Sequence, residues 1–160
     1  GGGIERESQI QKRAFMVWSD DAPDKLIFDM PAKGPFSSAF GLRRFFNDQP
    51  RQPHAGLDIA AAEGTRITAP AAGTVLETGN YFFNGNTVLL DHGQGMVSMF
   101  NHLSRIDVRK GMTLARGQLI GLIGKTGRVT GAHLHWTISL NNARVNPALF
   151  LPAHIRATIK

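Results

Sequence analysis

Glycine and proline break the chain into short apolar segments over most of its length, and this punctuation limits the possible folds. The 160 residues include 18 glycines and 8 prolines. Runs such as NTVLLDHG, GMVSMFNHL, QLIGLIGKTG and HLHWTISL are too short for long helices and are typical of strands. Many short strands at close spacing predict an all-β, mainly antiparallel domain.

Turn signals between these runs predict how consecutive strands are joined. The segment DHGQG lies between two strand-like runs and predicts a β-hairpin, and Asn141–Asn142 predicts a turn followed by a short return strand. The domain is expected to span residues 31–152. Residues 153–160 are expected to form a C-terminal tail.

The first thirty residues do not follow the strand pattern. Residues 4–18 are charged with intermittent apolar positions, which predicts a short helix, and SDDAPD ends it. We interpret residues 1–30 as a linker, or as the tail of a larger N-terminal region, with a short helical or irregular structure. The first glycines are interpreted as an artificial remnant, so the lack of a targeting segment here is uninformative.

The composition restricts both chemistry and partners. The chain has no cysteine, so any metal ion must be held by His, Asp or Glu. The net charge of +6 favours an anionic partner, such as nucleic acid, an anionic membrane or an acidic cell-wall polymer. The positive residues are scattered rather than arranged in a stripe with aromatic residues, so no specific nucleic-acid binding is expected. No apolar run is long enough for a transmembrane span.

The run TGAHLHWTI places two histidines at alternating positions. On a strand, His133 and His135 point to one side, roughly 7 Å apart along the chain, while Leu134 and Trp136 point to the other. Two hydrogen-bonded histidines lining a groove would explain the pair without a metal ion. A metal site would also explain it, and the spacing alone leaves open which histidine would bind the ion.

Further candidate ligands lie upstream of this pair. The segment PHAGLD contains His54 and Asp58 in what reads as a loop leading into a strand, and both residue types bind zinc. His102 ends the strand-like run MVSMFNH. His92, in the turn DHG, and His154, near the C-terminus, are expected to be structural or solvent-exposed.

A hydrolytic zinc site needs about three protein ligands, a water molecule and a group that accepts the proton of this water. The sequence has no HExxH motif, and the only glutamates after residue 30 are Glu63 and Glu77, both beside glycine-containing turns. Imidazole titrates near neutrality, so a histidine is the better candidate for the base.

These segments together resemble a known family. FGLR, HAGLD, APAAGTV, GNTVLLDHG, HLS and GQLIGLIGKTGRVTGAHLHW are similar to parts of the lysostaphin/LytM-type zinc endopeptidases, which cut peptidoglycan peptides. The resemblance covers residues 30–150 and implies a two-sheet β core with a narrow groove that holds a single Zn²⁺. The chain departs from the family at Phe100, where tyrosine is frequent, and the phenylalanine ring is expected to pack in its place.

The resemblance also implies roles for individual residues. His54, Asp58 and His135 would be the zinc ligands, His133 would be the catalytic base, and His102 would stabilise the transition state or shuttle protons. The implied activity is hydrolysis of peptide cross-links or stem peptides of bacterial peptidoglycan by a metal-activated water. Among these bonds we expect D-alanyl–meso-diaminopimelate cross-links rather than a polyglycine bridge.

The resemblance further implies partners, a location and an alternative. The expected partners are peptidoglycan peptides and an envelope regulator or inhibitory N-terminal region, and the expected location after export is the periplasm or cell envelope. The alternative is a catalytically inactive protein of this fold that regulates another cell-wall hydrolase. Such proteins are expected to lose metal ligands, whereas this chain keeps every motif position. Only the net charge favours a nucleic-acid-binding module.

Overall fold

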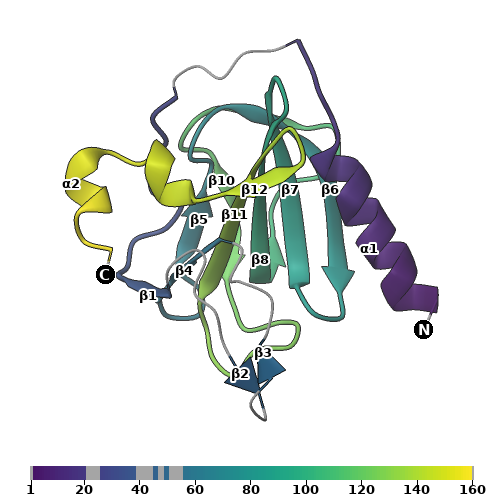
Figure 1. Ribbon diagram of the computed structural model, residues 1–160, viewed down its shortest axis with the longest axis horizontal. Helices are drawn as coiled ribbons and strands as arrows, with labels where there is room; N and C mark the ends of the chain where they lie inside the picture. The colour runs from purple at the N-terminus through teal and green to yellow at the C-terminus, as the bar shows by residue number, and fades with distance from the viewer. Residues whose placement is uncertain (1, 21–25, 39–44, 47–48, 51–55, 160) are drawn as a thin grey trace.

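Strands dominate a computed structural model of the chain, which describes residues 2–20, 26–38, 45–46, 49–50 and 56–159 (Figure 1). The strands are β1 (Phe36–Ser38), β2 (Phe45–Phe46), β3 (Gln49–Pro50), β4 (Leu57–Ile59), β5 (Arg66–Thr68), β6 (Gly73–Tyr81), β7 (Gly85–Gly93), β8 (Met96–Ile106), β9 (Thr113–Leu114), β10 (Leu119–Ile123), β11 (Leu134–Leu140) and β12 (Ala143–Val145). The helices are α1 (Gly2–Phe15), the 3₁₀-helix η1 (Pro147–Phe150) and α2 (Ala153–Arg156).

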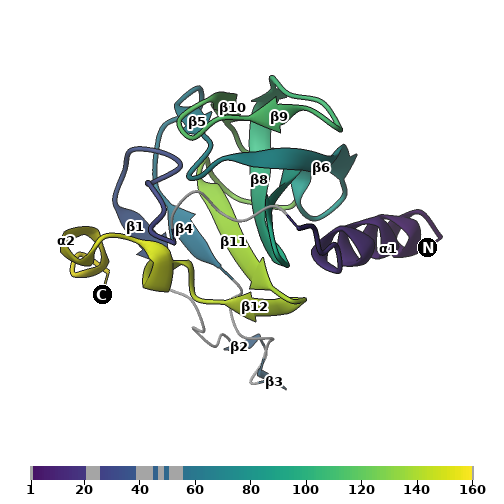
Figure 2. The same cartoon turned by 90° about the horizontal axis from the view of Figure 1, so that it is seen from above.

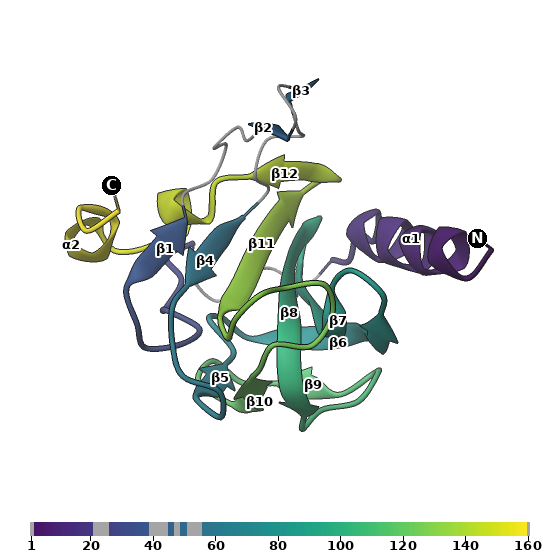
Figure 3. The same ribbon diagram turned by 90° about the horizontal axis from the view of Figure 1, so that it is seen from below.

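Ten of these strands form one antiparallel sheet. Its main path runs β1-β4-β11-β8-β7-β6-β9, while β12 pairs with β11, and β10 pairs with both β5 and β8. Strands β1, β4, β11 and β8 lie side by side in Figure 3, and Figure 2 shows β6 running across β8, with β5, β9 and β10 on the side of β6 away from β12. Strands β2 and β3 form a separate two-stranded sheet. The predicted all-β, mainly antiparallel fold is confirmed.

Both predicted turns join neighbouring strands. Strands β7 and β8 form a hairpin around Gln94 and Gly95, which have positive φ angles of 50° and 84°. Strands β11 and β12 are joined by Asn141 and Asn142, with φ angles of 49° and 66°. Two consecutive positive φ angles match the twist of a tight hairpin, and asparagine tolerates them better than most residues.

The alternation in β11 places one set of side chains in the main core. Leu134, Trp136 and Ile138 are fully buried there and pack with residues of neighbouring strands. Phe100 of β8 is also fully buried in this cluster, so its ring packs as expected at the position where the family often has tyrosine. The opposite side of β11 carries His135, whose side chain is 18% exposed.

The C-terminal end of helix α1 packs against the side of β7 and β8 away from the main core, and the helix confirms the predicted N-terminal helical extension. Glu5 lies in its first turn and Lys12 and Arg13 in its last turn, which complements the helix dipole. Its Ala14 and Phe15 are buried in a small cluster with three residues of β7 and β8, namely Leu89, Val97 and Met99. Strand β8 is therefore buried on both faces over most of its length.

The C-terminal segment also contacts the domain. Ile155 of α2 and Ile159 are partly buried against the main core.

Within the described part of the chain, no helix is long and apolar enough to cross a membrane. The boundaries at residues 1–30, 31–152 and 153–160 stay predictions.

The two tryptophans of the chain offer a matched test of this core. Trp136 is fully buried and its Nε1 donates to Ser98 Oγ at 3.3 Å, whereas Trp18 is 58% exposed. Trp136→Ala is expected to lower the free energy of unfolding by about 3–5 kcal/mol, because it opens a large cavity. Trp18→Ala should cost less than about 1 kcal/mol. Chemical denaturation followed by circular dichroism measures both, and equal losses would contradict the assignment of Trp136 to the core.

Candidate metal centre

Strand pairing brings residues from three parts of the chain to one place. In the ladder between β4 and β11, Asp58 lies directly opposite His135. On its other side β11 pairs with β8, where His135 lies opposite Asn101, the residue before His102. His133 lies just before β11 and forms an isolated bridge with Gly124. The antiparallel register therefore fixes which side chains meet.

Asp58 is the centre of this group. Its Oδ1 lies 2.7 Å from His135 Nδ1 and 3.8 Å from His133 Nε2. The imidazole ring of His102 lies 4.9 Å from that of His133 and 6.4 Å from that of His135, measured between centroids. The structure thus assembles four of the five residues that the sequence predicts for the site. The fifth, His54, lies outside the described residues.

Backbone carbonyls determine where two of the histidines carry their protons. A carbonyl oxygen can only accept, so the Nδ1–H of His133 donates to Gly131 at 3.0 Å and the Nδ1–H of His102 donates to Thr126 at 2.8 Å. When these rings are neutral, Nε2 of each is an unprotonated acceptor. For His133, this is the atom that faces Asp58.

His135 is held differently, between two side chains. Its Nδ1 faces the Asp58 carboxylate, and its Nε2 lies 3.3 Å from Thr137 Oγ1. A histidine that binds a metal ion through one nitrogen normally donates from the other, and the Thr137 hydroxyl is placed to accept this bond. Sequence reasoning missed Thr137, although its position two residues after His135 on the same side of a strand was a usable signal.

The backbone at His102 has an uncommon conformation. The sequence predicts that His102 ends its strand, but β8 continues to Ile106. Between Asn86 and Val88 strand β7 has one residue, whereas β8 has two between their partners Leu103 and Phe100. This β-bulge places His102 at a φ angle of 69°, in the left-handed region that residues other than glycine rarely adopt. The bulge re-aims the imidazole toward His133 and His135, and the strand continues beyond it.

The site is partly screened from solvent. His102 is 7% exposed, and burial lowers the pKa of its imidazole from 6.5 to about 4, with smaller contributions in the same direction from the nearby His133 and His135. The side chains of Asp58 and His133 are 14% and 22% exposed, so they remain accessible to a small ligand. His102 is therefore neutral near pH 7, and a ligand can still reach its neighbours.

The two remaining histidines lie away from this group, as the sequence predicts. His92 is 2% exposed, and its ring nitrogens lie 2.9 Å from the Ala72 carbonyl and 2.7 Å from Ser98 Oγ. His154 is exposed on α2. His92 is therefore a structural residue, and His154 is a surface residue.

The donor set fits a zinc ion in chemistry but needs one more ligand. Asp58 and His135 present an oxygen and a nitrogen to each other, and both residue types bind zinc. If Asp58 Oδ1 and His135 Nδ1 each lay about 2.0–2.2 Å from a tetrahedral zinc ion, the two atoms would be roughly 3.4 Å apart. In this structure they are 2.7 Å apart. Among the described residues, no group of three or more His, Asp or Glu side chains could hold a metal ion. A ligand from the undescribed segment, such as His54, would complete the set.

Comparison with known families places this geometry in context. A family model described as peptidase family M23 matches residues 52–147, which is more than half of the chain. The matched range includes all five predicted site residues, His54, Asp58, His102, His133 and His135.

Curated relatives agree with this match. The chain is 40% identical over 120 residues to the peptidoglycan DD-endopeptidase ShyA of Vibrio cholerae, covering 74% of this chain and 28% of that protein. It is 37% identical over 111 residues to the DD-carboxypeptidase/endopeptidase Mpg of Neisseria meningitidis, covering 69% of this chain and 26% of that protein. The chain therefore spans between a quarter and a third of the length of these relatives.

Solved structures share the fold. A putative peptidase M23 from Pseudomonas aeruginosa superposes with a TM-score of 0.84 at 49% identity, covering 95% of this chain and 62% of that one. A zinc-containing peptidase from Vibrio cholerae gives 0.69 at 29% identity, with 86% and 41% covered. The catalytic domain of lysostaphin from Staphylococcus simulans gives 0.64 at 28% identity, with 74% and 91% covered.

The sequence, the fold and the relatives therefore lead to one family. The expected lysostaphin/LytM-type resemblance and the expected enzyme class are confirmed, because the family match covers the motifs and the structural matches cover most of the chain. The chain belongs to peptidase family M23, a family of metallopeptidases.

Proposed function

We propose that this domain is a zinc-dependent endopeptidase that hydrolyses peptide cross-links or stem peptides of bacterial peptidoglycan. The observation that carries the proposal is the convergence of Asp58 with His102, His133 and His135 in a chain of family M23. Two relatives are named as enzymes that act on DD-peptide bonds, which supports D-alanyl–meso-diaminopimelate cross-links over a polyglycine bridge. The same relatives favour a location in the periplasm or cell envelope.

Asp58 and His135 would hold the zinc ion together with His54. Asp58 Oδ1 and His135 Nδ1 already face each other, and Thr137 is placed to fix the tautomer of His135 that binds through Nδ1. When bound, zinc would lower the pKa of a water molecule at the site and polarise the scissile carbonyl.

His133 would act as the general base. Its Nδ1–H is bonded to the Gly131 carbonyl, so its unprotonated Nε2 points to the side of Asp58 where the water would be. Nε2 can accept the proton of the water during attack and donate it later to the leaving amine. The tautomer needed for this role is therefore set before the substrate binds.

His102 is better suited to one of its two expected roles. Its Nδ1–H is bonded to the Thr126 carbonyl, so Nε2 of the neutral ring can accept a proton but cannot donate one to an oxyanion. This orientation favours a role in the proton transfer by His133, in which Nε2 of the neutral His102 ring accepts a hydrogen bond from the protonated His133 ring, over direct stabilisation of the transition state; the two ring centroids are 4.9 Å apart.

Digestion of purified peptidoglycan tests the function directly. The zinc-loaded protein is expected to convert cross-linked muropeptides into monomers with an intact D-alanine carboxyl terminus, as measured by mass spectrometry. A chelator should abolish the reaction, and added zinc should restore it. Release of glycine fragments from a polyglycine-bridged wall, with no cleavage of direct cross-links, would contradict the proposed bond.

Substitution of Asp58 tests the ligand assignment. Asp58→Ala is expected to lose both zinc and turnover, because it removes the oxygen that faces His135 Nδ1. Asp20→Ala, at an exposed position, is the control and should keep both. Metal analysis of the purified variants measures zinc occupancy, and full zinc content in Asp58→Ala would contradict the assignment of Asp58 as a ligand.

Substitution of His133 separates the base from the ligands. His133→Ala is expected to retain zinc and to reduce kcat by a factor on the order of 10²–10⁴, which is typical of a lost general base. His154→Ala, at an exposed position on α2, should behave like the wild type. Loss of zinc from His133→Ala would mean that both histidines of HLH are ligands.

A further inference from the structure

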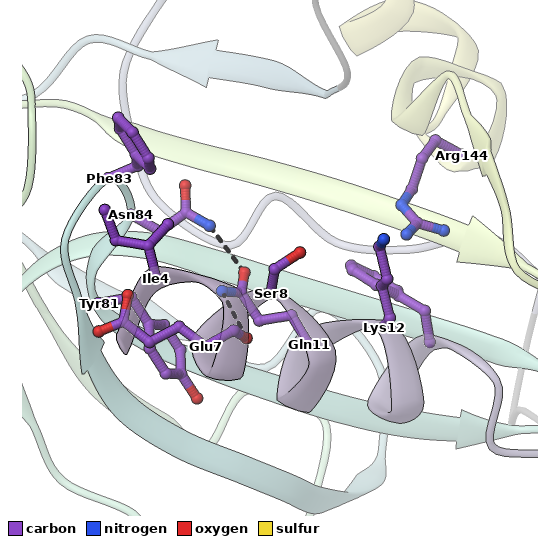
Figure 4. A pocket seen from close by; sticks show the side chains of 10 residues that line it. Ile4, Glu7, Ser8, Gln11, Lys12, Tyr81, Phe83, Asn84 and Arg144 are labelled. Atoms are coloured by element: carbon purple, nitrogen blue, oxygen red, sulfur yellow. Dashed lines mark hydrogen bonds between the residues drawn. The ribbon is translucent and has the colours of Figure 1, made fainter. Parts of the chain in front are cut away.

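The turn between β6 and β7 is held on its outer side by helix α1. Glu7 Oε2 accepts a hydrogen bond from the Phe82 N–H at 3.1 Å, and Gln11 Oε1 accepts one from Asn84 Nδ2 at 2.7 Å. Glu7 and Gln11 lie one helical turn apart and therefore share a face, and Gln11 Nε2 also donates to the Glu7 carbonyl at 3.3 Å. Figure 4 shows Gln11 between Glu7 and Asn84.

On its inner side the same turn contacts one candidate catalytic residue, His102. The Asn84 carbonyl accepts a hydrogen bond from the His102 N–H at 2.8 Å. The Phe83 carbonyl accepts one from the Arg128 N–H at 3.0 Å, in the segment that contains Thr126. Because the Thr126 carbonyl accepts from the His102 ring, the turn acts on both the backbone and the imidazole of His102.

Close packing makes this connection stiff. Gly85, directly after the turn, has a φ angle of 64°, and a Cβ atom at this position would overlap the backbone of Thr126. The hydroxyl of Thr126 accepts from the Asn86 N–H at 3.0 Å and donates to the Leu103 carbonyl at 2.7 Å. A displacement of the turn would therefore move the segment around Thr126 with it.

The left-handed backbone of His102 explains why such support matters. A residue other than glycine keeps a positive φ angle only where its surroundings over-determine it. For His102 the Asn84 carbonyl holds the N–H, and the Thr126 carbonyl holds the ring. Both carbonyls depend on the position of the turn, and the turn is tied to α1.

We propose that Gln11 and Glu7 are positioning residues for His102. They act through the turn between β6 and β7, which contains Asn84. Helix α1 is then part of the catalytic unit and has a role beyond packing Ala14 and Phe15 against β7 and β8. The inference rests on the proposed function only for the catalytic role of His102. The hydrogen bonds that connect α1 through Asn84 to the His102 N–H can be measured independently of activity.

Gln11→Ala tests this connection, and the chain offers a matched control in Gln9, which is exposed on the same helix. Gln11→Ala is expected to lower kcat on the order of 10-fold, with KM and zinc content unchanged, since small misplacements of catalytic groups are costly. Hydrogen exchange of the His102 amide should become faster. Gln9→Ala should change neither quantity. Gln11→Glu keeps an oxygen that can accept from Asn84 and should retain most of the turnover.

Introducing Gln11→Ala into the His102→Ala variant decides whether Gln11 acts through His102. In His102→Ala, a further Gln11→Ala substitution should cost no additional turnover, because the group that it positions is absent. The same loss in both backgrounds would overturn the proposal, as would unchanged kcat and His102 amide exchange in Gln11→Ala. If the wild type cleaves no cross-links, the proposed function fails, and the amide exchange still reports whether α1 holds His102.

Discussion

The antiparallel pairing of β11 with β4 and β8 is the constraint on which the site depends. It sets Asp58 opposite His135, at a distance where carboxylate and imidazole meet, and it places His102 on the next strand. No helix contributes a ligand among the described residues, so the spacing of candidate zinc donors follows from the spacing of strands. The buried side of β11, with Trp136 at its centre, keeps this register, because a shift by one residue would exchange the core and the site.

Main-chain carbonyls that accept hydrogen bonds further constrain the histidines of the site. The carbonyls of Gly131 and Thr126 select the tautomers of His133 and His102, and that of Asn84 holds the strained backbone of His102. These acceptors are provided by turns and by the segment before β11. The chemistry that we propose for the imidazoles therefore depends on the positions of three backbone carbonyls as well as on the histidines themselves.

The short strands, the β7–β8 hairpin at DHGQG and the turn at Asn141–Asn142 could be predicted from local signals, namely turn chemistry and alternation. Alternation also predicted that His133 and His135 share one side of a strand, but the expectation that Asp58 and His102 join them came from the family resemblance. The bulge at His102 could not be predicted, because it arises from unequal numbers of residues in two paired strands. The contact of α1 with the β6–β7 turn joins residues 73 positions apart, and no local pattern indicates it. Thr137 was accessible to the same alternation that identified the histidine pair.

The left-handed conformation at His102 also has a consequence for how this position can vary. A β-branched side chain would be excluded there on conformational grounds, whatever its chemistry, whereas asparagine, aspartate and glycine would be tolerated by the backbone. A survey of substitutions at this position would therefore contain two separable groups. One group would fold poorly, and the other would fold normally while lacking the imidazole. Protein yield would distinguish the first group, and turnover per folded molecule would distinguish the second.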